Sequence, residues 1–368
     1  MRVGHVPARD PQRPVKRFRR TRFLDPEILR GLFGLTPRAC WSRLQRGRSP
    51  FAPTFPDRRP NLPRASLPGR PLSREPYLRP TPQCDCHAPE IVAVADELRR
   101  GAASDWEYAE AVYNFTTHSV VHAMEGAPRG VVDTLRSGYG LCYDKVLLFM
   151  ALARAGGLQA RCCRLRFEFS EDMAIDRAPW VQILSRLGEC LDTRNDRRVQ
   201  DLAVAWQKVT GLVQEVIEER LAQSKIDGRP FTLETAEGPH PLAEVNVGDV
   251  WIPVDPSTDD AECAYYGLPL QRFGYLPGAL RMVRGSISTR LEAPTFGVRP
   301  YLTRLLVCSL ARGAVDELNR SLEEARRRGQ RILDDVGLAE YMSRHRRFYV
   351  PVEGLSALGI TLPPHPTA

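Results

Sequence analysis

The sequence predicts an α+β fold in which one apolar helix packs against an antiparallel sheet. A glycine-rich bend followed by an unbroken apolar run predicts a buried helix over 142–155. Two β-rich stretches, 242–247 and 249–254, meet at a Gly-Asp pair and predict a tight hairpin. The stretch 159–169 predicts a third strand shortly after the helix. We expect this helix and these strands to form the centre of one domain.

Local signals predict further helices around this centre. Proline at a first helical position opens one of them, and Ser104 or Asp105 can cap the next. The expected helices cover 89–100, 105 to about 121, and 130–136.

Cys142 is placed where a cysteine can become reactive. It begins the apolar helix directly after Gly138-Tyr-Gly140. A free thiol has a pKa near ~8.5, and helix N-terminal amides together with a neighbouring imidazolium favour the thiolate. The two glycines let the backbone turn sharply and bring amide N–H groups close to a substrate carbonyl. These features point to a nucleophilic thiol.

A histidine and an aspartate flank the predicted hairpin. His240 precedes its first strand and Asp255 follows its second. Because a tight hairpin brings its outer ends side by side, we expect these two residues to meet. A histidine can take and return the thiol proton, and a carboxylate can fix its tautomer and orientation. We expect Trp251 to pack the hairpin against the helix of Cys142.

These motifs occur in a familiar order. Gly140-Leu-Cys-Tyr-Asp144, an apolar helix, and then His240 followed by Trp-Ile-Pro-Val-Asp255-Pro resemble the transglutaminase-like superfamily of papain-like fold. The stretch from Tyr77 to Asp85 is similar to the opening of bacterial members. The resemblance covers about residues 77–257, with a long insertion. It implies a nucleophile at Cys142, a general base at His240 and an orienting partner at Asp255.

The resemblance implies cysteine-dependent acyl transfer on an amide or peptide bond, through a thioester and with a peptide or protein as substrate. We favour hydrolysis, as in a peptidase or amidase. Capture of the acyl group by an amine, as in a transglutaminase, stays open. So does a catalytically silent peptide-binding module, because Pro241 and Leu242 depart from the small and aromatic residues that are more usual after the family histidine. We expect no cofactor and no metal.

The charge of the chain is unevenly distributed. Residues 1–80 hold 19 Arg and Lys against 5 Asp and Glu, so in a chain of net charge +8 this segment carries +14 and the remainder −6. Fifteen of the 31 prolines also precede residue 83. We therefore expect three parts, namely a basic, mostly disordered arm over 1–76, a transglutaminase-like domain over 77–298, and a helical C-terminal extension over 299–368.

Three segments outside the motifs have two interpretations each. The basic arm can contact nucleic acid or anionic lipid, or be a solvated tail, which we favour because no nucleic-acid module follows it. The insertion over 164–239 holds a predicted amphipathic helix, which is either a lid over the site or an extra layer on the sheet. The charge pairs of the C-terminal extension, such as Asp316 with Arg320, are typical of a solvated helix face, which we favour over a partner-binding surface.

Several patterns argue against other classes of protein. The sequence shows no secretion signal and no apolar run of the ~20 residues that a membrane span needs. Its nine cysteines are odd in number and scattered, which favours a reducing cytoplasm. Cys84-Asp-Cys-His87 lacks a second pair at zinc-site spacing, and we interpret His118 and His122 as structural or surface residues on one helical face. Oligomeric state stays open.

Overall fold

The fold is known from a computed structural model. It describes residues 75–123, 130–169, 231–234, 240–281, 285–293 and 312–363, with single positions 222 and 366. Apart from residues 75, 76 and 222, the predicted basic arm and the predicted amphipathic helix at 198–224 lie outside the described residues.

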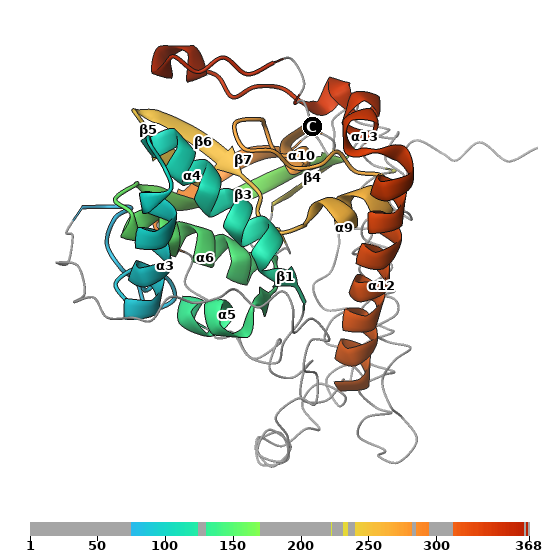
Figure 1. Ribbon diagram of the computed structural model, residues 1–368, viewed down its shortest axis with the longest axis horizontal. Coiled ribbons are helices and arrows are strands. Elements are labelled where there is room, and N and C mark those ends of the chain that lie inside the picture. Colours follow the sequence, from blue (N-terminus) through green and yellow to red (C-terminus); the bar gives the residue numbers. More distant parts are fainter. Residues whose placement is uncertain are drawn as a thin grey trace, which may run out of the picture.

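A five-stranded antiparallel sheet forms one layer of the domain (Figure 1). Strand β3 is long and pairs with β5 through its first residues, with β4 through its last residues and with β7 along its middle. The predicted hairpin is confirmed as β5 and β6, whereas β4 and β7 were not predicted. The strands are β3 (Ala160–Phe169), β4 (Phe231–Glu234), β5 (Leu242–Val247), β6 (Val250–Val254) and β7 (Gly285–Leu291).

Helices form the second layer and one flank of the molecule. Figure 1 shows α3, α4 and α5 around α6, while α12 runs along the opposite side next to α9. The helices are α3 (Pro89–Arg100), α4 (Asp105–Asn114), α5 (Val131–Ser137), α6 (Cys142–Ala155), α9 (Asp260–Tyr265), α10 (Gly278–Arg281), α12 (Arg312–Val336) and α13 (Leu338–Arg344). Short 3₁₀ turns cover Arg346–Phe348 and Leu355–Leu358.

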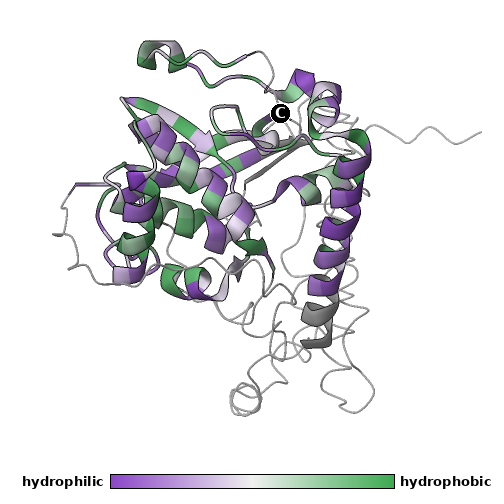
Figure 2. Cartoon of the chain, in the orientation of Figure 1, coloured by the Kyte–Doolittle hydropathy of each residue, from purple (hydrophilic) through white to green (hydrophobic). Residues whose placement is uncertain are grey.

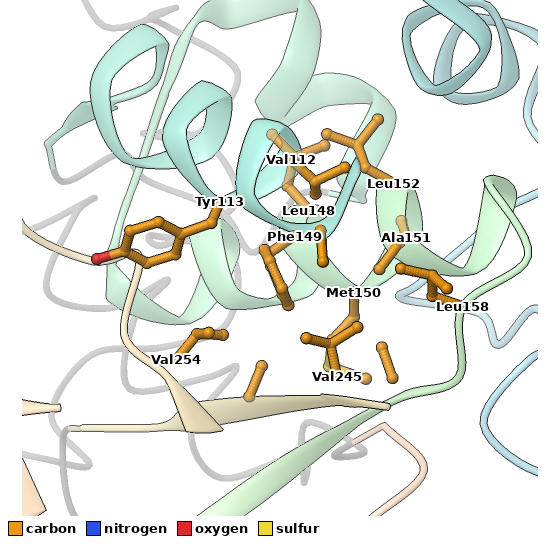
Figure 3. Close-up of a cluster of buried hydrophobic side chains, with 14 of the residues drawn as sticks. Val112, Tyr113, Leu148, Phe149, Met150, Ala151, Leu152, Leu158, Val245 and Val254 are labelled. Atoms are coloured by element: carbon orange, nitrogen blue, oxygen red, sulfur yellow. The ribbon is translucent and has the colours of Figure 1, made fainter. Parts of the chain in front are cut away.

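Helix α6 is the centre of the core. Every residue from Asp144 to Ala155 is buried, as expected for a helix that is apolar on nearly all sides. Figure 2 shows this apolar character, in contrast with the polar outer face of α12. Figure 3 shows the side chains of Leu148, Phe149 and Met150 between α4 and the hairpin strands. The predicted helix on an antiparallel sheet is therefore confirmed.

Helix α4 is shorter than predicted. Its predicted N-cap is confirmed, since Ser104 Oγ accepts a hydrogen bond of 3.1 Å from the Glu107 N–H. The α-helix ends at Asn114, continues as a π-helical turn over Phe115–Ser119 and gives way to the short strand β1 (Val121–His122). The β-branched residues at the end of this segment favour the extended backbone of β1.

The expectation that His118 and His122 share one helical face is therefore wrong. His118 lies in the π-helical turn and is exposed, whereas His122 lies in a strand.

The two faces of the hairpin have different partners. Val245, Ile252 and Val254 belong to the core cluster around α6. Trp251 lies on the other face, where the guanidinium carbon of Arg161 is 3.6 Å from its ring centroid. The expected packing of Trp251 on α6 is wrong, because alternation along a strand turns it away once its neighbour Ile252 faces the helix.

One buried arginine ties three distant segments together. Arg154, near the end of α6, donates through Nε and Nη2 to the carbonyl of Ala160 at 3.0 and 2.7 Å. Its Nη1 donates to the carbonyl of Arg79 at 2.8 Å, and its Nη2 also donates to the carbonyl of Glu292. The guanidinium therefore joins the segment before α3, the start of β3 and the turn after β7.

The C-terminal extension over 299–368 was predicted to be helical. In the described part it consists of α12 and α13, which are separated by Gly337 at a φ of 83°.

The described residues include no helix with the length and apolarity of a membrane span. Six cysteines lie in the described part of the chain, and none of them forms a disulfide there: Cys84, Cys86, Cys142, Cys162, Cys163 and Cys263.

Candidate active site

Cys142 is the first residue of α6 and is partly exposed. It follows β2 (Tyr139–Gly140) and the N-cap residue Leu141, whose N–H donates to Asp144 Oδ2 at 2.9 Å. This hydrogen bond uses one of the helix N–H groups that lack a partner within the helix. The acidic residue two positions after the cysteine thus fixes the start of the helix.

The bend before Cys142 is held from two sides. Gly138 adopts the left-handed conformation at a φ of 73°, which glycine permits without strain. Strand β1 runs parallel to β2, with the Val121 N–H bound to the Gly138 carbonyl and the Ala123 N–H bound to the Gly140 carbonyl. A side chain at Gly140 would come within 2.8 Å of Asp144 Cβ. The predicted close turn is therefore packed tightly against the helix start.

His240 and Asp255 meet at the open end of the hairpin. Because Ala243 pairs with Val254, the chain segment just before β5 and the one just after β6 lie side by side. His240 Nε2 is 2.6 Å from Asp255 Oδ2. This is the meeting of the hairpin ends that the sequence predicts.

The thiol of Cys142 is the second partner of the His240 side chain and acts to raise the pKa of the ring. Since Asp255 takes Nε2, the ring nitrogen left for the thiol is Nδ1. One imidazole thus lies between a thiol and a carboxylate.

Asp255 is buried and well satisfied. Its Oδ1 accepts from the Ser257 N–H at 3.1 Å and from the Ser257 hydroxyl, while Oδ2 contacts the imidazole. Burial acts to raise the pKa of Asp255, but the His240 charge and these hydrogen bonds outweigh it and lower the pKa. This carboxylate therefore stays ionised next to the ring.

The charge on His240 responds to both neighbours. Burial alone would lower its pKa, yet the carboxylate of Asp255 and the sulfur of Cys142 raise the pKa well above its usual value. The arrangement favours an imidazolium beside the Asp255 carboxylate. A thiolate paired with an imidazolium is the reactive form of a cysteine nucleophile.

Pro241 and Leu242 do not prevent this arrangement. Pairing between β5 and β3 begins at Leu242, opposite Cys163, so Pro241 precedes the ladder and removes no hydrogen bond between paired strand residues. The Leu242 side chain is buried with Cys163 and Leu165 on the side of the sheet away from α6.

Four other cysteines lie in the core. Cys84 and Cys86 are buried, and their thiols donate to the carbonyls of Leu147 and Leu78. Cys162 and Cys163 are buried on opposite faces of β3, as alternation predicts. The described residues contain no group of three or more His, Cys, Asp or Glu that could hold a metal.

Two contacts near the site were not predicted from the sequence. The first is the hydrogen bond from Ser257 to Asp255. The Asp-Pro-Ser sequence could have indicated it, because an aspartate in such a turn often accepts from the backbone two residues on. His122 binds Glu262 through Nδ1 at 3.0 Å, and no local pattern connects residues so far apart in sequence.

The helix, the antiparallel sheet and the Cys–His–Asp arrangement together define an α+β protein with a papain-like core. Residues 92–256 match the family model of the transglutaminase-like superfamily, and this range includes Cys142, His240 and Asp255. The chain therefore contains a domain of the transglutaminase-like superfamily, whose members are commonly cysteine-dependent acyl-transfer enzymes or peptidases. Comparison with curated proteins and with solved structures gave no match.

Proposed function

We propose that this protein is a cysteine-dependent acyl-transfer enzyme that acts on an amide or peptide bond, with water as the acyl acceptor. The observation that carries the proposal is the position of His240, which contacts both the Cys142 thiol and the Asp255 carboxylate. Membership of residues 92–256 in a superfamily that commonly performs this chemistry supports it.

The first half of the reaction forms a thioester. The Cys142 thiolate attacks the amide carbonyl carbon, and N–H groups at the start of α6 stabilise the negative charge that develops on the oxygen. The tetrahedral intermediate then collapses, the C–N bond breaks, and the leaving amine takes the proton of the His240 imidazolium. Asp255 keeps the ring in the orientation that serves both partners.

The second half releases the acyl group. His240, now neutral, removes a proton from water, whose oxygen attacks the thioester carbonyl. The C–S bond breaks to give a carboxylic acid, while the thiolate and the imidazolium are restored. An amine in place of water gives a new amide, and this is the transglutaminase alternative. The same three residues serve both outcomes, so the acceptor is decided by competition at the thioester.

An activated ester tests the proposal without knowledge of the natural substrate. Incubation with p-nitrophenyl acetate should acetylate Cys142 and release p-nitrophenolate in a burst, with the modified peptide identified by mass spectrometry. We expect His240→Ala to lower the acetylation rate about 100-fold, since general acid–base catalysis contributes about 10²–10⁴. Added glycine amide distinguishes hydrolysis from transfer, because acetylglycine amide exceeds the amount formed without protein only if the amine captures the thioester.

Two other results would point away from an enzyme. Acetylation of Cys142 no faster than that of the remaining cysteines would favour the silent peptide-binding module. Equal acetylation rates in the wild type and in His240→Ala would exclude His240 as the base.

A further inference from the structure

A cluster of buried charges lies behind the candidate active site. Four charged residues are buried there, namely Lys145 of α6, Asp259 at the N-cap of α9, Glu262 of α9 and Arg326 of α12. Lys145 and Arg326 bear opposite charge to the two carboxylates, and all four interact electrostatically. Buried charges persist only when they compensate one another, so this cluster joins the three helices.

The cluster reaches the active-site motif along the chain. Lys145 follows Cys142 by three residues, and its Nζ donates to the carbonyl of Thr117 at 3.1 Å. Asp259 follows Asp255 by four residues and caps α9 by accepting from the Glu262 N–H at 2.8 Å. Cys142 and Asp255 are thus each connected to this charged cluster through a few residues of chain.

Helix α12 docks closely against α9. A Cβ atom at Gly329 would lie 1.7 Å from the carbonyl oxygen of Ala261, so only glycine fits at this crossing. Leu322, Ala325 and Leu333 are buried on the same helix. With Gly329 they follow a three- to four-residue spacing, which is typical of a packed helix face. α12 is therefore packed closely against the domain.

Arg326 lies one turn before Gly329 and reaches the strand beside the active-site bend. Its Nη1 donates to the carbonyl of His122 at 2.8 Å. The N–H groups of Val121 and Ala123 point towards β2. Because successive residues of an extended strand point to opposite edges, the carbonyl of His122 between them points away from β2. β1 is thus held between Arg326 on one edge and the bend before Cys142 on the other.

Glu262 holds the side chain of the same residue. It contacts His122 Nδ1 at 3.0 Å, while Arg326 binds the His122 carbonyl. α9 and α12 therefore fix both the backbone and the side chain of β1. A shift of α12 would move β1, and with it the Gly140 carbonyl that Ala123 binds two residues before Cys142.

We propose that the C-terminal helix α12 is part of the catalytic unit and that Arg326 is a positioning residue, which holds β1 and the bend before Cys142 in place. This inference rests on the proposed function of Cys142. It extends the functional unit well beyond residues 92–256, which match the family.

The test compares thiol reactivity at two kinds of position in the full-length protein. Iodoacetamide labelling, mapped by mass spectrometry, gives the rate at Cys142 and at the buried Cys84 and Cys263. In Arg326→Gln we expect the rate at Cys142 to fall about tenfold, as for loss of an orienting partner behind an active group. Cys84 and Cys263 should stay protected, and Arg326→Lys, which keeps a cationic donor, should recover most of the rate.

Matched variants sharpen the result. Arg331→Gln removes an exposed arginine of the same helix and should leave the rate at Cys142 unchanged. Gly329→Ala forces α12 away from α9 without a change of charge and should lower the rate as Arg326→Gln does.

Each remaining outcome decides the question. An unchanged rate at Cys142 in Arg326→Gln would overturn the inference, and so would labelling of Cys84 and Cys263 together with Cys142, since that indicates a general loss of structure. Low reactivity of Cys142 in the wild type would contradict the proposed function, which separates the two failures.

Discussion

At the scale of single residues, the site depends on how one imidazole is shared. His240 uses Nε2 for Asp255, which is itself held by Ser257, and is left with Nδ1 for Cys142. The carboxylate accepts several hydrogen bonds and stays ionised, so it stabilises positive charge on the ring. Their contact raises the pKa of His240, to which Cys142 also contributes, and lowers the pKa of Asp255, to which Ser257 also contributes.

Replacement of Asp255 by asparagine should separate orientation from charge. Asp255→Asn keeps the shape but removes the anion that raises the pKa of His240. We expect the rate of Cys142 alkylation at pH 6.5 to fall about 10- to 100-fold, because each pKa unit changes the ionised fraction up to tenfold. Above about pH 9 solvent removes the thiol proton in both proteins and the rates should converge.

The matched control for this substitution is Asp249→Asn. Asp249 lies at the other end of the hairpin, is exposed, and has a φ of 70°, which asparagine adopts readily. Its alkylation profile should match the wild type. A parallel loss in Asp249→Asn, or no loss in Asp255→Asn at pH 6.5, would contradict the role assigned to the carboxylate.

At the scale of elements, short-range signals predicted well and long-range pairing did not. The limits of α3 and α6 agree with the prediction, because both are set by local signals. A proline marks the start of α3, and a Gly-Gly pair follows the end of α6. β7 was missed because Gly-Ser-Ile-Ser-Thr-Arg-Leu is mostly polar and exposed, and its partner β3 lies more than 100 residues earlier. A strand of this kind is defined by its neighbour.

The same distinction applies to the site. Cys142, His240 and Asp255 sit at the ends of a helix and a hairpin that local patterns predict, so their positions could be inferred. Arg326 could not, because it lies in a run of three arginines, of which one is buried and two are exposed. Only Gly329, a glycine inside a long charged helix, indicated close packing there.

Arg154 gives a test of how the elements are joined. Arg154→Met keeps much of the side-chain length but leaves the carbonyls of Arg79, Ala160 and Glu292 without this donor. An unsatisfied buried polar group costs about 1–3 kcal/mol, so we expect the free energy of unfolding in urea to fall by about 3 kcal/mol.

The control for Arg154→Met is Arg100→Met on α3. Arg100 is exposed and pairs with Glu97 three residues earlier, a contact worth less than about 1 kcal/mol. Similar losses in the two variants would show that the carbonyl contacts of Arg154 do not join the elements.

At the scale of the whole molecule, the charged cluster makes stability depend on pH. Burial lowers the pKa of Lys145 to about 8, although Asp259 and Glu262 act to raise it. In the unfolded chain a lysine has a pKa near ~10.4. Between these values the unfolded state binds a proton that the folded state does not, so the contribution of Lys145 to stability rises with pH.

Lys145→Met removes this dependence. We expect the unfolding free energy of the wild type minus that of the variant to increase from pH 8 to pH 10 by an amount on the order of 1–3 kcal/mol. Urea unfolding followed by tryptophan fluorescence at both values measures it. Taking the difference cancels the titration of tyrosines and cysteines common to both proteins. A constant or falling difference would contradict a buried lysine with a lowered pKa.

The central claim is that Cys142 and His240 form an activated pair, and the pH dependence of Cys142 alkylation tests it most directly. The rate constant for iodoacetamide is measured from pH 5 to 10 in the wild type and in His240→Ala, with peptide mapping to identify the modified cysteine. We predict rapid, selective labelling of Cys142 below pH 7 in the wild type and its loss in the variant, because the imidazolium sustains the thiolate at acidic pH. Labelling of Cys142 that rises only in alkali, with the same profile in both proteins, would contradict the account.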